Sequence, residues 1–176
     1  MENDNLLIDN FLTTRSESAF NQLYQYKTPA LYQMALRLTA QNHEAEELVQ
    51  KTWVVAIEKL QNFKGTSTLK TWLTGILINL FREHSRQEQK LKKTDDQSVL
   101  DAKFVEMSVP DAIDLENAIL QLSPGYKEIL LLHDVEGFTH KEIGAMLDIS
   151  DGTSKSQLFQ ARKILRKYLN ENHKIQ

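Results

Sequence analysis

The chain has 176 residues, of which 21 are Lys or Arg and 24 are Asp or Glu, so its formal net charge is -3. Taken as a total, this charge argues against a nucleic-acid-binding protein. The proportions of hydrophobic residues (41%) and charged residues (26%) are typical of a globular protein with one or two compact domains. Since the chain has no cysteine and its five histidines lack the spacing of a metal site, we expect no metal, and little enzymatic chemistry remains available.

The apolar runs and the beginning of the chain also limit its location. No apolar run approaches the roughly 20 residues that are needed to cross a bilayer. Residues 1–15 are acidic and polar, whereas a secretory signal is basic and then apolar. We therefore expect a cytoplasmic protein that does not insert into membranes.

Apolar residues recur with helical spacing along almost the whole chain, which predicts an all-α fold. We expect residues 1–17 to be a tail and the start of the first helix. The spacing then predicts a helix at 18–28 and a second helix that begins at Pro29, because proline suits the first helical turn. The helix at 43–61 has the longest apolar stripe, and a fourth helix follows at about 69–86. These four helices are enough for one small core.

Residues 87–111 lose this spacing, are first basic and then acidic, and contain a proline near their end. We interpret them as a linker. Its acidic part, 94–111, separates a first unit at 18–93 from a second unit at 112–172. A short docked helix is the alternative, and it would use Leu100, Phe104 and Met107.

The second unit ends with two predicted helices and a three-residue turn at 148–150, which is the spacing of a helix-turn-helix. Two motifs earlier in this unit also predict helix starts: Ser123-Pro124, and the capping-box pattern Thr139-x-x-Glu142. The last helix, at about 151–169, carries side chains that suit base edges and phosphates: Thr153, Lys155, Ser156, Gln157, Gln160, Arg162 and Lys163. The alternative is an amphipathic helix whose basic side only faces solvent.

Several short motifs in this unit are shared with a known family: Leu122-Ser123-Pro124, Glu136-Gly137, Glu142-Ile143, Ile149-Ser150, Gly152-Thr153, Lys155-Ser156 and Ala161-Arg162. On these motifs, residues 123–165 resemble region 4 of bacterial RNA polymerase sigma factors, specifically the extracytoplasmic-function (ECF) group of the sigma-70 family. The resemblance implies binding to the minus-thirty-five promoter element and adds Thr139 to the expected DNA contacts. Ser154 stands where an aliphatic residue is usual, and Gln157 stands where arginine is common.

Residues 19–86 resemble region 2 of the same family, which binds the polymerase clamp and recognises the minus-ten element as it melts. In the family, an Asp-x-x-Gln pattern binds a coiled coil on the largest polymerase subunit, and this chain has Glu47-x-x-Gln50. The polymerase contacts that we expect on this helix are Glu47, Leu48, Gln50, Lys51 and Val54. The alternative is a solvated polar side with one stray valine.

The loop at 63–68 corresponds to the family's loop that captures a flipped promoter base. With the helix that follows, it carries the expected region 2 DNA contacts: Lys64, Thr66, Ser67, Lys70, Thr74, Asn79, Arg82 and Arg86. Trp72 and Phe81 lie on the apolar stripe, so we expect core residues, with base-stacking platforms as the alternative. Relatives usually have arginine near positions 75 and 78, where this chain has Gly75 and Ile78.

The two resemblances together predict a two-domain sigma factor whose partners are core RNA polymerase and promoter DNA. We therefore expect no enzyme activity, no cofactor and no small-molecule substrate. Family membership also implies an inhibitory anti-sigma factor. The alternatives are a helix-turn-helix regulator that acts without polymerase and a helical adaptor that binds only proteins. The charge distribution agrees with DNA binding: residues 63–93 have seven basic and two acidic groups (+5), and residues 152–176 have six and one (+5). Residues 94–151 have three basic and thirteen acidic groups (-10), and this negative charge offsets both basic segments in the net charge of the chain.

Overall fold

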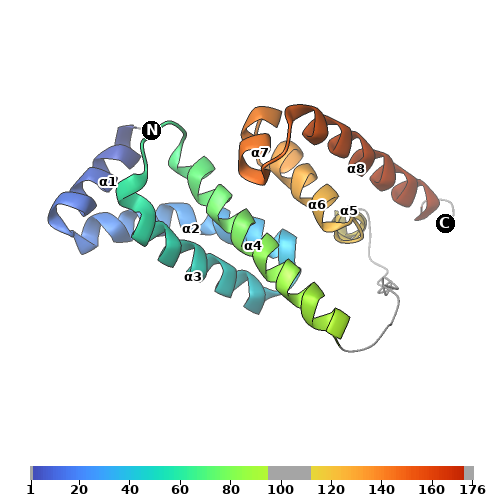
Figure 1. The fold of residues 1–176 in the computed structure, drawn as a ribbon, viewed down its shortest axis with the longest axis horizontal. Helices are drawn as coiled ribbons and strands as arrows, with labels where there is room; N and C mark the ends of the chain where they lie inside the picture. The colour runs from blue at the N-terminus through green and yellow to red at the C-terminus, as the bar shows by residue number, and fades with distance from the viewer. Residues whose placement is uncertain (1, 95–111, 173–176) are drawn as a thin grey trace. The chain divides into compact units, whose positions relative to one another are not determined.

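The computed structural model describes residues 2–94 and 112–172, and these ranges are helical without any strand (Figure 1). The chain divides into two compact units, Met1–Glu83 and His84–Gln176, which confirms the all-α fold of two small helical domains. Within the described ranges, no helix is both long and apolar enough to span a membrane. The helices are α1 (Glu2–Thr14), α2 (Glu17–Thr39), α3 (Asn42–Lys59), η1 (Leu60–Asn62), α4 (Leu69–Thr94), α5 (Ala112–Leu120), α6 (Pro124–Leu130), η2 (Leu131–Val135), α7 (His140–Leu147) and α8 (Asp151–Asn172).

The structure has a separate helix where we predicted a tail and the start of the first helix. Residues 2–14 form α1, which packs against α2 and buries Ile8. Lys27 of α2 donates a hydrogen bond to Asp4 of α1 at 2.7 Å, and the rings of Phe11 and Phe20 lie 5.5 Å apart. A helix this short is marginal without such tertiary contacts, so its own sequence pattern was a weak signal.

Pro29 does not start a second helix, which was our prediction. It lies inside α2, which runs without interruption from Glu17 to Thr39. A proline inside a helix costs about 3 kcal/mol or more because it removes a hydrogen bond and crowds the preceding turn. Buried residues before it (Ala19, Leu23) and after it (Leu31, Met34) pack on one side of the helix, against α3 among others. This packing outweighs the local cost.

The core of the first unit forms between α2 and α3 and is completed by α4. Trp53 of α3 is buried, and its Nε1 donates a hydrogen bond to Oγ1 of Thr28 at 3.0 Å. From α4, the unit buries four apolar side chains: Leu69, Leu73, Leu77 and Ile78. This helix continues to Thr94, so residues 87–94 are helical where we predicted the start of a linker. The rest of the predicted linker, and the alternative helix within it, lie outside the described residues.

After the end of α4, the described part of the second unit continues with α5 and has the predicted helix-turn-helix at its C-terminal end. Pro124 lies in the first turn of α6, as predicted, although the side chain of Ser123 does not cap the helix. After α6 the chain makes a π-helical turn, η2, and then leaves it at Gly137, which has a left-handed backbone (φ +77°). Both hydrogen bonds of the predicted capping box between Thr139 and Glu142 are present at the start of α7.

Candidate nucleic-acid interface

The turn between α7 and α8 is closed tightly, and this requires a glycine. Asp148 ends α7 in the left-handed region (φ 55°), and the Ile149 N–H donates to the Gly144 carbonyl at 3.0 Å. A Cβ at Gly144 would lie only 2.7 Å from the Ile149 carbonyl oxygen. Ser150 then caps α8 by accepting a hydrogen bond from the Thr153 N–H at 3.0 Å. The result is a helix-turn-helix in which α8 takes the place of the recognition helix.

One side of α8 is buried and the opposite side is exposed. The buried residues are Ser154, Leu158, Ala161 and Leu165, which recur every three or four positions. The exposed side carries Lys155, Ser156, Gln160 and Lys163, all of them predicted DNA contacts. Thr153 and Gln157 lie half-buried along one edge, and Thr139 is exposed at the start of α7.

Phe159 is a candidate contact that the sequence analysis missed. Its side chain is 64% exposed on the same side of α8 as Lys155 and Lys163, four residues away in each direction. An exposed phenyl ring among polar and basic groups suits contact with a thymine methyl group in the major groove. The four-residue spacing is visible in the sequence, but an apolar residue type by itself gives no sign that the ring is exposed.

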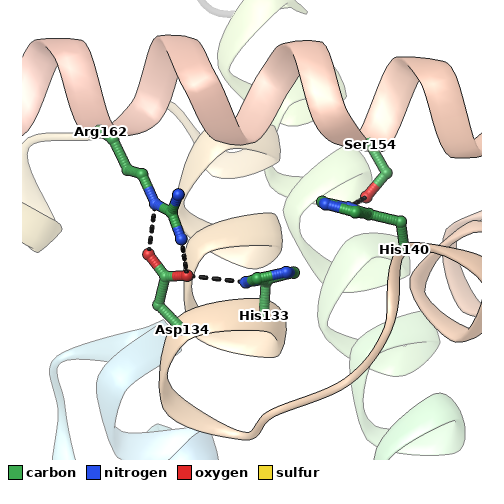
Figure 2. Close-up of polar contacts among 5 residues, drawn as sticks. All are labelled: His133, Asp134, His140, Ser154 and Arg162. Carbon is green, nitrogen blue, oxygen red and sulfur yellow. Dashed lines mark hydrogen bonds and ion pairs between the residues drawn. The ribbon is translucent and has the colours of Figure 1, made fainter.

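Ser154, where the resemblance led us to expect an aliphatic residue, is fully buried and has a polar partner. Its Oγ lies 2.9 Å from Nδ1 of His140, which begins α7 (Figure 2). The His140 ring stacks on that of His133, with centroids 4.6 Å apart. The His140 pKa is lowered by burial first, and then by positive charge at His133, Lys155 and Arg162, while Asp151 opposes the shift. The His140 ring nitrogen therefore provides the buried Ser154 hydroxyl with its hydrogen-bond partner.

Arg162 is bound within the unit, although we had predicted a DNA contact. Its Nε donates to Asp134 Oδ2 at 2.9 Å, and its Nη2 donates to Asp134 Oδ1 at 2.6 Å (Figure 2). This bidentate pair lowers the pKa of Asp134, with His133 contributing a further hydrogen bond. The same pair raises the pKa of Arg162.

The loop before α4 in the first unit is held at both of its ends. The rings of Phe63 and Trp72 lie 5.2 Å apart, and the Thr71 N–H donates to Thr68 Oγ1 at 3.0 Å, which caps the helix. Between these contacts Gly65 has a left-handed backbone (φ 66°), and the predicted contacts Lys64 and Thr66 are exposed while Ser67 is half-buried.

The predicted contacts on α4 do not share one side of the helix. Asn79 and Arg86 are exposed and Arg82 is half-buried, and their spacing of three and four puts them together. Lys70, although exposed, and Thr74 lie on a different side, and Thr74 is only 3% exposed. Thr74 therefore belongs to the core of this unit. Ile78 is also a core residue, with no exposed surface, and Trp72 and Phe81 are half-buried.

A third surface lies on α3. Glu47, Gln50 and Lys51 are exposed, and Lys51 lies 3.2 Å from Glu47 in an ion pair. Val54, on the same side, is 58% exposed. Leu48, which we predicted among these contacts, is in the core instead. Ile57, which we did not predict, extends the exposed apolar part of this surface by one turn.

Comparisons with known proteins determine the family. Residues 23–91 match the family model of sigma-70 region 2, and residues 112–165 match that of sigma-70 region 4. The ECF RNA polymerase sigma factor EcfG of Rhodopseudomonas palustris is 30% identical over 142 residues, which are 78% of this chain and 77% of that protein. The chain belongs to the ECF sigma factors. The family predicted from the sequence is confirmed.

Two further relatives agree with this assignment. The ECF sigma factor SigE of Mycolicibacterium smegmatis is 30% identical to this sigma factor over 159 residues, which are 86% of this chain and 62% of the relative. A structure of the sigma factor RpoE in complex with the anti-sigma factor NepR, from Bartonella quintana, is 29% identical with a TM-score of 0.72. That match covers 86% of this chain and 96% of the other. As a sigma factor, the protein is a transcription initiation factor that works with RNA polymerase at promoters.

Proposed function

We propose that this ECF sigma factor uses the three surfaces described above for three functions: polymerase binding, minus-ten binding and minus-thirty-five recognition. The exposed side of α3, with Glu47, Gln50, Lys51 and Val54, binds core polymerase. The loop at 63–68 and the side of α4 with Asn79, Arg82 and Arg86 bind the minus-ten element as it opens. The outer side of α8 reads the minus-thirty-five element. We expect this work to take place in the cytoplasm, where the polymerase acts.

The observation that carries the proposal is the exposed side of α8. It combines two cations (Lys155, Lys163) with short hydrogen-bonding groups (Ser156, Gln160) and a phenyl ring (Phe159), none of which is buried. Phosphate contacts give affinity, and hydrogen bonds and apolar contacts to base edges give specificity. Such a surface on the second helix of a helix-turn-helix suits the major groove.

We also propose the domain boundaries and one further partner. Region 2 spans 18–93, joined by α1 as part of the same unit, region 4 spans 112–172, and 94–111 is the connection. An anti-sigma factor is the further partner. This proposal is supported by the relative from Bartonella quintana, which was solved in complex with one.

The test of the sigma function is run-off transcription with purified bacterial core polymerase over a library of randomised promoters. The wild type is expected to enrich one pair of upstream and downstream elements. If no element is enriched above core polymerase alone, the proposal is wrong.

A matched pair of variants tests the polymerase surface. Gln50→Ala combined with Val54→Asp places a charge where the partner helix would pack, and should weaken core binding by at least about tenfold. Leu6→Asp places the same charge on another exposed apolar residue (68% exposed) of the same unit, on α1, and should leave core binding unchanged. Equal binding by both variants would exclude this surface.

A further inference from the structure

Two polar contacts join the recognition helix α8 to the elements that support it. Near the start of α8, Ser154 bonds to His140 at 2.9 Å, and further along Arg162 makes its two bonds to Asp134. Arg162 lies eight positions after Ser154, which corresponds to about 12 Å along the helix axis. The helix is therefore held at two separate points by directional bonds.

His133 connects these two contacts into one network. Its Nδ1 lies 2.7 Å from Asp134 Oδ1, and its ring stacks on that of His140. Figure 2 shows Arg162 and Ser154 pointing from α8 toward Asp134, His133 and His140. The network thus runs from η2, past the start of α7, to α8.

The polar network adds directional bonds to the apolar contacts of α8. Leu158, Ala161 and Leu165 hold the helix by hydrophobic packing, which is not directional. A rotation of α8 by about 10° about its axis moves a side-chain atom about 6 Å from that axis by about 1 Å. A shift of this size breaks a hydrogen bond to a base edge.

We propose that Asp134, Arg162, His140 and Ser154 are positioning residues that set the rotation of α8 and thereby decide which side chains reach the bases. The proposal rests on the sigma function proposed above. It also changes the role of Arg162, whose guanidinium group serves Asp134 and not a phosphate. The ion pair is partly exposed, with 45% of the Arg162 side chain and 29% of the Asp134 side chain accessible. Its main effect is therefore on the rotation of α8 and not on the free energy of unfolding.

The direction in which Asp134→Ala changes DNA affinity distinguishes a positioning role from a simple electrostatic effect. Asp134→Ala removes a negative charge from the DNA-binding unit, so electrostatics alone predicts tighter DNA binding. If Asp134 positions α8, the holoenzyme should instead bind the selected promoter about tenfold more weakly, and should discriminate less against a promoter with a scrambled upstream element. The double variant with Arg162→Ala should bind no more weakly than either single variant, because the two residues act through each other.

Arg162→Gln and Lys163→Gln form a matched pair for the role of Arg162. Each removes one positive charge, at adjacent positions of α8. Lys163→Gln should reduce the slope of log affinity against log salt concentration by about one, whereas Arg162→Gln should leave the slope unchanged. Equal reductions would show that Arg162 contacts a phosphate and would overturn its positioning role.

The His140–Ser154 contact is tested by a conservative replacement. His140→Asn keeps a hydrogen-bonding group near the place of Nδ1 and should retain discrimination between the two promoters, whereas His140→Ala and Ser154→Ala should reduce it. Thermal unfolding of each variant, followed in parallel, identifies any that is unfolded at the assay temperature. A folded Asp134→Ala and a folded Ser154→Ala that both discriminate like the wild type would overturn the proposal.

Promoter selection by the wild-type holoenzyme shows whether the positioning proposal has failed alone or the sigma function has failed with it. A wild-type holoenzyme that selects no promoter disproves both. A wild type that selects a promoter, with positioning variants that behave like it, disproves positioning alone.

Discussion

Two glycine-to-alanine substitutions in the helix-turn-helix should have different effects on stability. Gly144 lies in α7, where a Cβ would be 2.7 Å from the Ile149 carbonyl oxygen and 3.3 Å from Asp151 Oδ1. Gly152 lies in the first turn of α8, where the nearest atom to a Cβ would be Ser150 Oγ at 3.7 Å, an ordinary contact. The same chemical change is therefore crowded at one position and unhindered at the other.

The magnitude at Gly144 follows from three contributions. Helix propensity favours alanine by about 1 kcal/mol at an interior position. Against this, overpacking against a backbone atom costs about 1–3 kcal/mol, and displacing the turn also weakens the Ile149 to Gly144 hydrogen bond, for about a further 1 kcal/mol. We expect Gly144→Ala to destabilise the second unit by about 2 kcal/mol. Gly152→Ala should be neutral or stabilising by up to about 1 kcal/mol.

Circular dichroism during thermal unfolding measures both effects. In a unit of this size, a loss of about 2 kcal/mol should lower the Tm by about 10 °C. The fluorescence of Trp53 and Trp72, the two tryptophans of the chain, reports on the first unit, and its transition should not move. A Gly144→Ala variant as stable as Gly152→Ala would refute the close approach of the turn to α7.

Three further predictions follow from buried, exposed and titrating residues. Ile78→Arg introduces the residue type that the resemblance led us to expect near this position, but at a core position with no exposed surface, so it should destabilise the first unit by about 4 kcal/mol or more. The neighbouring exposed change Asn79→Arg should cost less than about 0.5 kcal/mol, and equal stabilities in urea unfolding would contradict the burial of Ile78. Phe159→Ala should leave unfolding unchanged, because the ring is exposed, but weaken promoter binding by about tenfold; unaltered binding would exclude the ring as a contact. Because the pKa of His140 is lowered below 6.5 in the folded state, its contribution to stability is complete above that pH and is lost as the pH falls below it. Unfolding at a series of pH values should show a smaller acid loss in His140→Asn, and identical curves for the two proteins would contradict the shift.

The positions of Leu48, Thr74 and Arg162 show where sequence reasoning reached its limit. Leu48 and Thr74 lie next to polar residues in the sequence and were predicted as contacts. Their positions around the helix place both side chains in the core. Arg162 has the residue type of a phosphate contact, yet Asp134 binds it from 28 residues away. Residue type and local spacing carry no information about such a distant partner.

The recurrence of apolar residues was enough to predict an all-α chain, because one buried stripe per helix must repeat with the helical period. The capping box at Thr139 and the spacing of the helix-turn-helix were also predictable, since both depend on residues close together in the chain. The continuity of α2 through Pro29, the formation of α1 and the network around His140 required the tertiary structure. Each of these depends on contacts between segments that are distant in sequence. The free energy of such contacts can outweigh the local conformational preference of the chain.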